Sequence, residues 1–190
     1  NQLTGPFILR RMKSDVLKEL PPKTENVYRI ELEEEQRKLY LAAVVDARDK
    51  LQAAKPEDKM TVFAVLMRLR EICCDPRLIA DNWEGGSAKL DACLELVTEA
   101  VAGGHRILLF SQFTSMLELL AKRLDEAGVS HFTLQGSTPK PVRAELVRRF
   151  NSGEADVFLI SLRAGGTGLN LTAADIVIHY DPWWNLSLIH

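Results

Sequence analysis

Apolar positions recur along this chain with two different periods. Helical spacing runs through residues 33–52 and again through the segment that ends before Pro76, and Lys55–Asp58 forms a polar turn between them. Strict alternation over residues 27–32 predicts a short strand instead. The first part of the chain should therefore contain one short strand followed by two helices.

The pattern changes after a hydrophilic loop at residues 82–86. Short apolar runs then alternate with amphipathic helices, and the runs occupy residues 107–110, 131–134, 157–160 and 176–178. Strands that are apolar on both faces and separated by helices are typical of a parallel sheet covered on both sides. We therefore predict an α/β fold of the nucleotide-binding type.

Capping residues predict where the helices of this second part begin. Ser87 would cap the first helix, and Ser115 with Glu118 would form a capping box for the next. Pro139 would open a third helix that turns Val142 towards the core. The arginines of that helix, Arg143, Arg148 and Arg149, would point outwards.

Composition excludes several classes of protein. The 190 residues are 46% hydrophobic and 26% charged, which rules out wholesale disorder, and no apolar run is long enough to span a bilayer. With a net charge of −2, any nucleic-acid site must be a local patch. The cysteines, Cys73, Cys74 and Cys93, lack metal-ligand spacing, so we predict buried thiols in a reducing cytosol. A first residue other than methionine suggests an excerpt of a longer sequence.

Two loops after predicted strands carry groups that suit an anion, because ligands of such sheets bind where strands end. In Ser111–Thr114, hydroxyls and the Gln112 amide could donate hydrogen bonds, although by residue type alone helix capping is the favoured interpretation. In the next loop, Gly136 allows close approach of the backbone and Thr138 could donate to a phosphate. Arg143 could add a charge there, and an ordinary turn is the alternative.

The third loop, residues 161–171, is the most informative. It places three glycines within four residues directly after a buried strand. Exposed amides there could cradle phosphates, and Arg163 could neutralise one. A plain glycine-rich turn is the alternative, but we favour function because these glycines cost unfolded-state entropy with no evident structural return.

Several other motifs in the sequence do not point to a functional site. No Gly-Lys-Ser/Thr sequence of a Walker A loop occurs, and the acidic Asp125–Gly128 ends an amphipathic helix, where a metal-holding acid is not expected. Trp183 and Trp184 follow the last strand and could stack on bases, although packing is the simpler interpretation. The scattered histidines are interpreted as structural.

Taken together, the motifs resemble the second half of a Swi/Snf-type ATPase motor of the bacterial variety. The segments that carry the resemblance are Phe7-Ile8-Leu9-Arg10-Arg11, Leu20-Pro21-Pro22-Lys23, Gln36-Arg37-Lys38-Leu39-Tyr40, Leu69 to Pro76, Ile107 to Phe113, Gly136-Ser137-Thr138, Arg163 to Thr172 and Asp181 to Asn185. They cover nearly the whole chain in the expected order.

The resemblance implies a DNA-stimulated ATPase that translocates on double-stranded DNA with two RecA-like lobes. Residues 1–22 would link the lobes, 23–85 would form a helical insertion, and 86–190 would form the second RecA-like lobe, truncated at its C-terminal end. The intact protein would use ATP and Mg²⁺, held mostly by the first lobe, and none is expected on this chain. Its partners would be duplex DNA, the first lobe and a DNA-bound protein, in the bacterial cytoplasm at the nucleoid.

The same resemblance assigns roles to residues of the three loops. Gly168 and Asn170 would face the nucleotide, and no residue is expected to be catalytic or to bind metal. The residues expected to bind the phosphate backbone, irrespective of base sequence, are Ser111, Gln112, Gly136, Thr138, Arg143, Arg163, Ala164, Gly165 and Trp184.

Departures from the family limit what the chain is expected to do. The phosphate-binding lysine, the magnesium-binding acids and the arginine finger have no counterpart here, so we expect no ATPase activity from this polypeptide alone. A stand-alone module that binds nucleic acid or protein without turnover is the alternative. A lobe from an RNA-unwinding helicase is a third possibility, which Leu20-Pro21-Pro22-Lys23 and the helical insertion disfavour.

Overall fold

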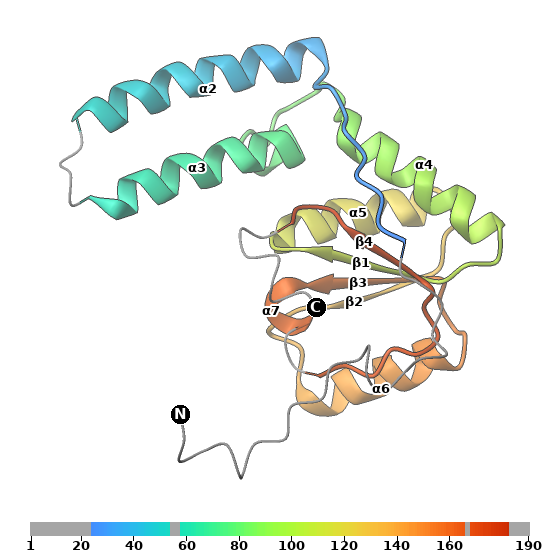
Figure 1. The fold of residues 1–190 in the computed structure, drawn as a ribbon. Coiled ribbons are helices and arrows are strands. Elements are labelled where there is room, and N and C mark those ends of the chain that lie inside the picture. Colours follow the sequence, from blue (N-terminus) through green and yellow to red (C-terminus); the bar gives the residue numbers. More distant parts are fainter. Residues whose placement is uncertain (1–23, 54–57, 166–167, 183–190) are drawn as a thin grey trace, which may run out of the picture.

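A four-stranded parallel sheet forms the centre of the molecule (Figure 1). The computed structural model describes residues 24–53, 58–165 and 168–182. The strands are β1 (Ile107–Ser111), β2 (His131–Leu134), β3 (Val157–Ser161) and β4 (Ile176–His179), in the order β2-β3-β1-β4. The helices are α2 (Glu34–Ala53), α3 (Lys59–Cys74), α4 (Ala88–Ala102), α5 (Thr114–Glu126), α6 (Lys140–Asn151) and α7 (Leu162–Gly165), with a 3₁₀ turn η2 (Pro76–Leu78). The predicted α/β class is confirmed.

Helices cover both faces of the sheet because its strands are apolar on both faces. Leu109 and Leu159 point into a core shared with α4 and α5, and Leu108 and Phe158 point into a second core with α6 and α7. All four of these side chains are buried. Burying a side chain of this size contributes about 1.5–3 kcal/mol, so the two cores account for much of the stability of the lobe.

The parallel register brings the ends of the strands to one side. Ile107 pairs with Val157 on β3 and with Ile176 on β4, and Leu134 of β2 pairs with Ile160. The residues that follow the four strands therefore share one side of the sheet, which we call the carboxyl edge. It comprises residues 111–114, 135–139, 161–165 and 180–182, together with Arg143 of α6, whose Nη2 lies 3.5 Å from the Thr138 carbonyl.

Helices α2 and α3 form an antiparallel hairpin that projects from the sheet (Figure 1). The side chain of Asp58 caps α3, accepting a hydrogen bond from the Thr61 amide at 3.1 Å. The two predicted helices are confirmed, but the predicted strand at 27–32 is wrong, since residues 24–33 form no regular element. Val27 and Tyr28 are 84% and 64% exposed, and no strand among the described residues pairs with this segment.

Three predictions about the later helices also need correction. Ser87 occupies the N-cap position of α4, but its hydroxyl donates to the Cys74 carbonyl instead of capping the helix. The capping box is wrong because α5 begins at Thr114, which places Ser115 inside the helix. Val142 is 47% exposed, because α6 packs through Leu146, Val147 and Phe150.

Burial keeps two of the three cysteines protonated. Cys74 and Cys93 are buried, and their removal from water raises the pKa of each thiol to about 12. Cys73 is only half-buried, so the prediction of burial holds for two of the three. Among the residues described, no helix is long and apolar enough to span a bilayer.

Candidate nucleic-acid interface

The loop after β1 is closed by its own side chains. Ser111 is fully buried, and its hydroxyl donates to the Phe113 carbonyl at 3.3 Å while accepting from the Phe113 amide at 3.2 Å. The Ser111 hydroxyl thus shapes the turn into α5, the structural role left open as the alternative for this loop.

Gln112 connects this loop to the end of β4. Its backbone amide donates to the Asp181 carboxylate at 3.0 Å, and Asp181 is only 3% exposed. Burial raises the pKa of the Asp181 carboxyl, and the hydrogen bond from the Gln112 amide counteracts part of that rise. Within the described part of the chain, the buried side-chain amide of Gln112 and the Asp181 Oδ1 atom have no hydrogen-bond partner.

The loop after β2 carries an open glycine beside an arginine. A Cβ atom at the exposed Gly136 would meet no other atom within 4 Å. The Thr138 hydroxyl accepts from the Gln135 amide at 3.1 Å, which closes the turn. Arg143 is half-buried and its Nη2 lies 3.5 Å from the Thr138 carbonyl, so its guanidinium turns back to the loop and does not point outwards as predicted.

The loop after β3 begins with the short helix α7. Arg163 is exposed on this helix, whereas Ala164 is buried and its amide lies 3.4 Å from the Ser161 hydroxyl. A Cβ atom at Gly165 would lie 2.9 Å from Cε1 of Phe110, and Gly168 has a φ of 62°. Two glycines thus have structural reasons, and the view that these glycines bring no structural return is wrong. Gly166 lies outside the described residues.

The segment after Gly168 is held against α6 by hydrogen bonds. The Asn151 side chain donates to the Asn170 carbonyl at 2.9 Å and accepts from the Ala173 amide at 3.3 Å. Gly168 and Asn170 are both exposed. The role of Asn151 was missed, because a single asparagine at a helix end gives no sequence signal for such a contact. Trp184 lies outside the described residues.

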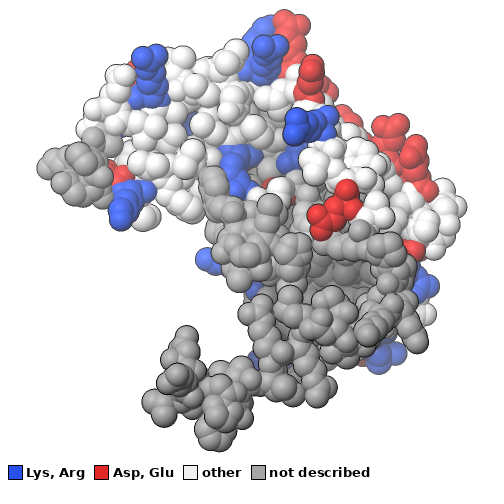
Figure 2. Space-filling model, in the orientation of Figure 1, with Lys and Arg blue, Asp and Glu red and all other residues white. Residues whose placement is uncertain are grey.

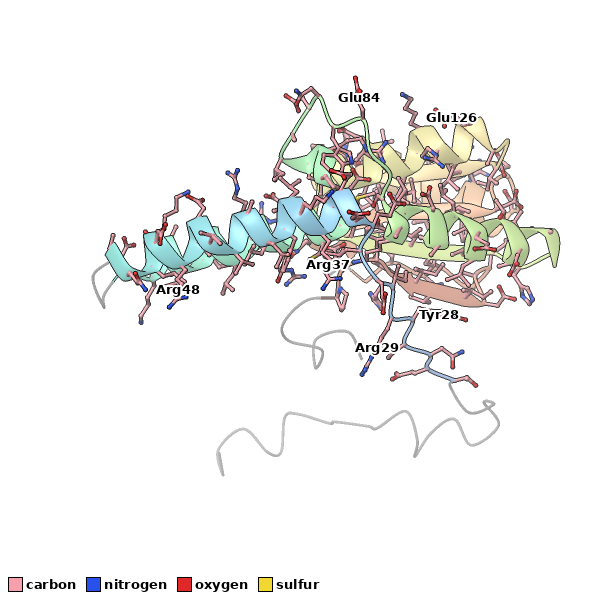
Figure 3. All side chains as sticks on the ribbon, turned by 90° about the horizontal axis from the view of Figure 1, so that it is seen from above. Tyr28, Arg29, Arg37, Arg48, Glu84 and Glu126 are labelled. Atoms are coloured by element: carbon pink, nitrogen blue, oxygen red, sulfur yellow. The ribbon has the colours of Figure 1, made fainter. Side chains whose placement is uncertain are left out.

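Charge is unevenly distributed over the surface in spite of the small net charge. Figure 2 shows acidic side chains over α4, which carries Asp91, Glu95 and Glu99, whereas basic and acidic side chains both lie over the α2–α3 hairpin. Arg37 and Arg48, three helical turns apart, project from the same side of α2 (Figure 3). At the carboxyl edge the cations are Arg143 and Arg163.

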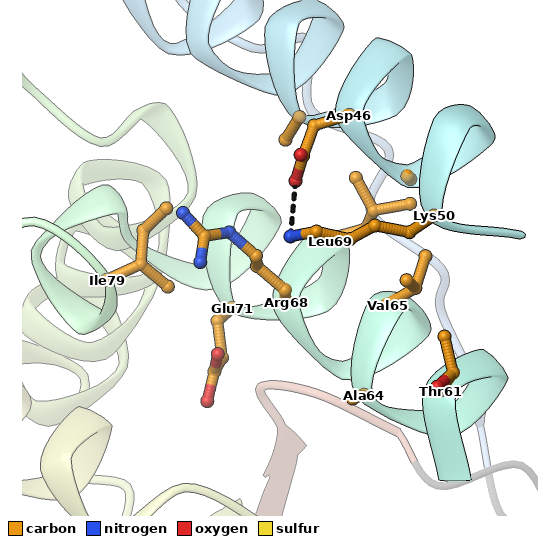
Figure 4. Close-up of a pocket in the computed structure, with 11 residues that line it drawn as sticks. Asp46, Lys50, Thr61, Ala64, Val65, Arg68, Leu69, Glu71 and Ile79 are labelled. Atoms are coloured by element: carbon orange, nitrogen blue, oxygen red, sulfur yellow. Dashed lines mark hydrogen bonds and ion pairs between the residues drawn. The ribbon is translucent and has the colours of Figure 1, made fainter. Parts of the chain in front are cut away.

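A separate hollow of about 480 Å³ lies between α2 and α3 (Figure 4). Ala43, Ala47 and Val65 line it, together with Asp46 and Lys50, whose carboxylate and ammonium form an ion pair at 2.7 Å. This hollow belongs to the hairpin and not to the carboxyl edge. Nowhere in the described ranges do three or more His, Cys, Asp or Glu side chains gather as metal ligands would.

Comparison with known proteins identifies the family to which the chain belongs. Residues 88–190 match the helicase conserved C-terminal domain. The chain belongs to this family. Residues 1–78 match the SNF2-related domain, so the resemblance to Swi/Snf-type proteins is confirmed.

Relatives of this kind occur in bacteria and animals. The chain is 37% identical over 187 residues to an uncharacterized ATP-dependent helicase of Mycoplasma genitalium, covering 96% of this chain and 18% of that protein. It is 37% identical over 194 residues to the SWI/SNF-related matrix-associated actin-dependent regulator of chromatin subfamily A member 1 of Mus musculus, covering 95% and 18%. The chain thus spans about a fifth of the length of these relatives.

Solved structures agree with this placement. The Sulfolobus solfataricus SWI2/SNF2 ATPase C-terminal domain superposes with a TM-score of 0.73 at 28% identity, over 81% of this chain and 70% of that one. The ATPase core of the same organism in complex with dsDNA superposes with a TM-score of 0.78 at 28% identity, over 97% and 41%. The parallel sheet with its flanking helices is therefore RecA-like, as in the SWI2/SNF2 ATPases.

Proposed function

We propose that this chain is the second motor lobe of an ATP-dependent double-stranded-DNA translocase or remodeller. Its carboxyl edge binds the phosphates of the tracking strand, and the lobe closes on ATP held by a first RecA-like lobe. Family membership and the DNA complex of the similar Sulfolobus ATPase core support this proposal. The observation that carries it is the placement of exposed Arg163 and of Arg143, beside open Gly136, on one edge of the sheet.

The edge has the chemistry that a sugar–phosphate backbone requires. Two guanidinium groups supply charge and directed donors for phosphate oxygens, and Gly136 lets a phosphate approach the backbone. Because phosphates are common to all sequences, the binding would be independent of base identity. Ser111 and Gln112 would act by holding the shape of the edge, since the Ser111 hydroxyl and the Gln112 side-chain amide are buried.

Nucleotide contact would fall to the segment after α7. Gly168 has open space around it and Asn170 is exposed, so both fit a surface that faces ATP across an interlobe cleft. The amide of Asn170 can donate to a phosphate or ribose oxygen. ATP with Mg²⁺ would supply the phosphoanhydride bond whose hydrolysis drives translocation, and its remaining ligands would come from the first lobe.

The proposal is tested by titrating the isotope-labelled chain with a short DNA duplex and following backbone amide shifts by NMR. Even weak binding is visible in this way. We expect the largest shifts at residues 136–138 and 163–165, and no comparable shifts along α4, where Figure 2 shows acidic side chains. Shifts that concentrate on α4 and α5, or none at millimolar duplex, would contradict the proposal.

A further inference from the structure

The end of α3 and the exit of β4 are joined by hydrogen bonds between residues more than one hundred positions apart. The Tyr180 hydroxyl donates to the Cys74 carbonyl at 2.8 Å, and Arg70 Nη2 donates to the Pro182 carbonyl at 2.8 Å. Arg70 and Cys74 lie in the segment that matches the SNF2-related domain, and Tyr180 and Pro182 lie in the helicase C-terminal domain. The contacts therefore cross the boundary between the two family segments.

The position of Cys74 at the end of a helix explains why its carbonyl accepts these long-range hydrogen bonds. Cys74 is the last residue of α3, and the final carbonyls of a helix have no partner within the helix. The Cys74 carbonyl receives two long-range donors, the Tyr180 hydroxyl and, at 3.1 Å, the Ser87 hydroxyl. Tyr180 is 3% exposed, so its hydroxyl would lose a buried hydrogen bond if α3 moved away.

The residue after Tyr180 connects these contacts to the loop that follows β1. Asp181 accepts the Gln112 amide proton at 3.0 Å, at the start of the loop that follows β1. Residues 180–182 are therefore held alternately by α3, by the loop after β1, and by α3 again. Lys89 lies 4.7 Å from the centre of the Tyr180 ring, which further restricts this side chain.

From this chain of contacts we infer that Tyr180 and Arg70 are positioning residues that couple the α2–α3 hairpin to the carboxyl edge. A displacement of α3 would pull on residues 180–182 and release the Gln112 amide, which changes the shape of the loop beside the proposed phosphate site. The hairpin would thus control how well the edge fits DNA. The effect on DNA rests on the proposed function, whereas the mechanical coupling does not.

The chain offers matched control variants for this inference. Ser87→Ala removes a hydrogen bond to the same Cys74 carbonyl as Tyr180→Phe, but it leaves the hydrogen bond between the Tyr180 hydroxyl and that carbonyl in place. Arg68→Gln removes an arginine two residues from Arg70 on the same helix, on the side that lines the hollow between α2 and α3 (Figure 4). A general loss of stability at the junction would affect test and control variants alike.

The first experiment measures hydrogen exchange of the Gln112 backbone amide in the whole chain. We expect Tyr180→Phe and Arg70→Gln to accelerate this exchange roughly two- to tenfold, as for the loss of one hydrogen bond, and Ser87→Ala and Arg68→Gln to leave it within about twofold of wild type. Unchanged exchange in both test variants, or equal acceleration in the controls, would overturn the coupling.

The second experiment measures duplex DNA affinity at several salt concentrations. Tyr180→Phe should weaken DNA binding roughly two- to tenfold, the factor expected for the exchange of the Gln112 amide. The slope of log K against log salt should not change, because no phosphate contact is lost. A changed slope would mean that Tyr180 acts at the phosphates themselves and would refute the positioning role. If the wild-type chain binds no DNA, the proposed function fails, while the exchange of Gln112 still decides the coupling.

Discussion

Arg163 and Arg143 make separable contributions to phosphate binding at the scale of single residues. Each neutralised phosphate adds about 0.9 to the slope of log K against log salt, so Arg163→Ala and Arg143→Ala should each lower the slope by about 1 and weaken all sequences equally. Fluorescence anisotropy with two unrelated duplexes measures both effects.

The matched control is Arg123→Ala on α5, where the guanidinium already pairs with Asp91 at 3.1 Å. This variant should keep the wild-type slope. Slopes that stay the same in all three variants would remove both arginines from the interface.

An added methyl group should destabilise the protein at one glycine of the carboxyl edge and be tolerated at another. Gly165→Ala places a Cβ 2.9 Å from Phe110, so α7 or Phe110 must shift, at a cost of about 1–3 kcal/mol in the free energy of unfolding. Gly136→Ala meets open space and should change that free energy by less than about 0.5 kcal/mol. Urea denaturation followed by circular dichroism distinguishes them, and equal losses would show that the close approach of Phe110 to Gly165 is not what requires glycine.

Asp181 and Asp175 should make the stability of the chain depend on pH in opposite directions. The pKa of buried Asp181 is raised above its ordinary value of 3.8, so the folded state holds this proton more tightly than the unfolded state. Stability from Asp181 is therefore greatest below that value and falls as pH rises through the folded pKa. Asp181→Asn should remove this fall.

Asp175 provides the opposite case. The His105 hydrogen bond holds the pKa of Asp175 below 3.8, so its contribution is present above that value and is lost as pH falls through the lowered pKa. Urea denaturation between pH 3 and 7 measures both. If Asp175→Asn and Asp181→Asn altered the pH profile in the same direction, the burial of Asp181 would not determine its titration.

At the scale of elements, the sequence pattern predicts those helices and strands whose formation depends on residues close together in the sequence. The helices of the hairpin and the strands of the sheet follow from periodicity, and β2 was predicted with its observed bounds, His131–Leu134. The strand at 27–32 failed because alternation describes only one strand and carries no information about whether another lies alongside. Ser115 failed as a cap because the buried Ser111 already closes the turn before α5.

In the candidate site, too, features set by local sequence could be predicted and features set by contacts between distant residues could not. The loops that follow the strands could be predicted, since parallel strands place them on one edge, and so could the arginines that they carry. The orientation of Arg143 and the burial of Ser111 could not, because both depend on contacts made by the folded chain. Asn151, Tyr180 and Arg70 act over 19 to 112 residues of sequence, and no local pattern records such pairs.

At the scale of the whole molecule, the contacts between the hairpin and the lobe among the described residues gather at the end of the hairpin that holds Cys74. Cys74 belongs to the core formed by α4, α5 and the sheet, and Met67 and Leu78 pack against that core. Towards the far end, aliphatic side chains such as Val45 and Met60 are 63% and 76% exposed. Local stability should therefore decrease along α3 away from Cys74.

This gradient is open to measurement by hydrogen exchange of the whole chain. Amides near the C-terminal end of α3, such as that of Asp75, which donates to the Glu71 carbonyl at 2.9 Å, should exchange on the timescale of the sheet because releasing them opens the shared core. Amides near residues 44–50 and 60–64 should exchange at least tenfold faster, since these parts of α2 and α3 pack against each other and not, among the described residues, into the shared core. Uniform exchange along α3 would show that the hairpin opens as one unit, and the rigid end on which the coupling to Tyr180 depends would then not exist.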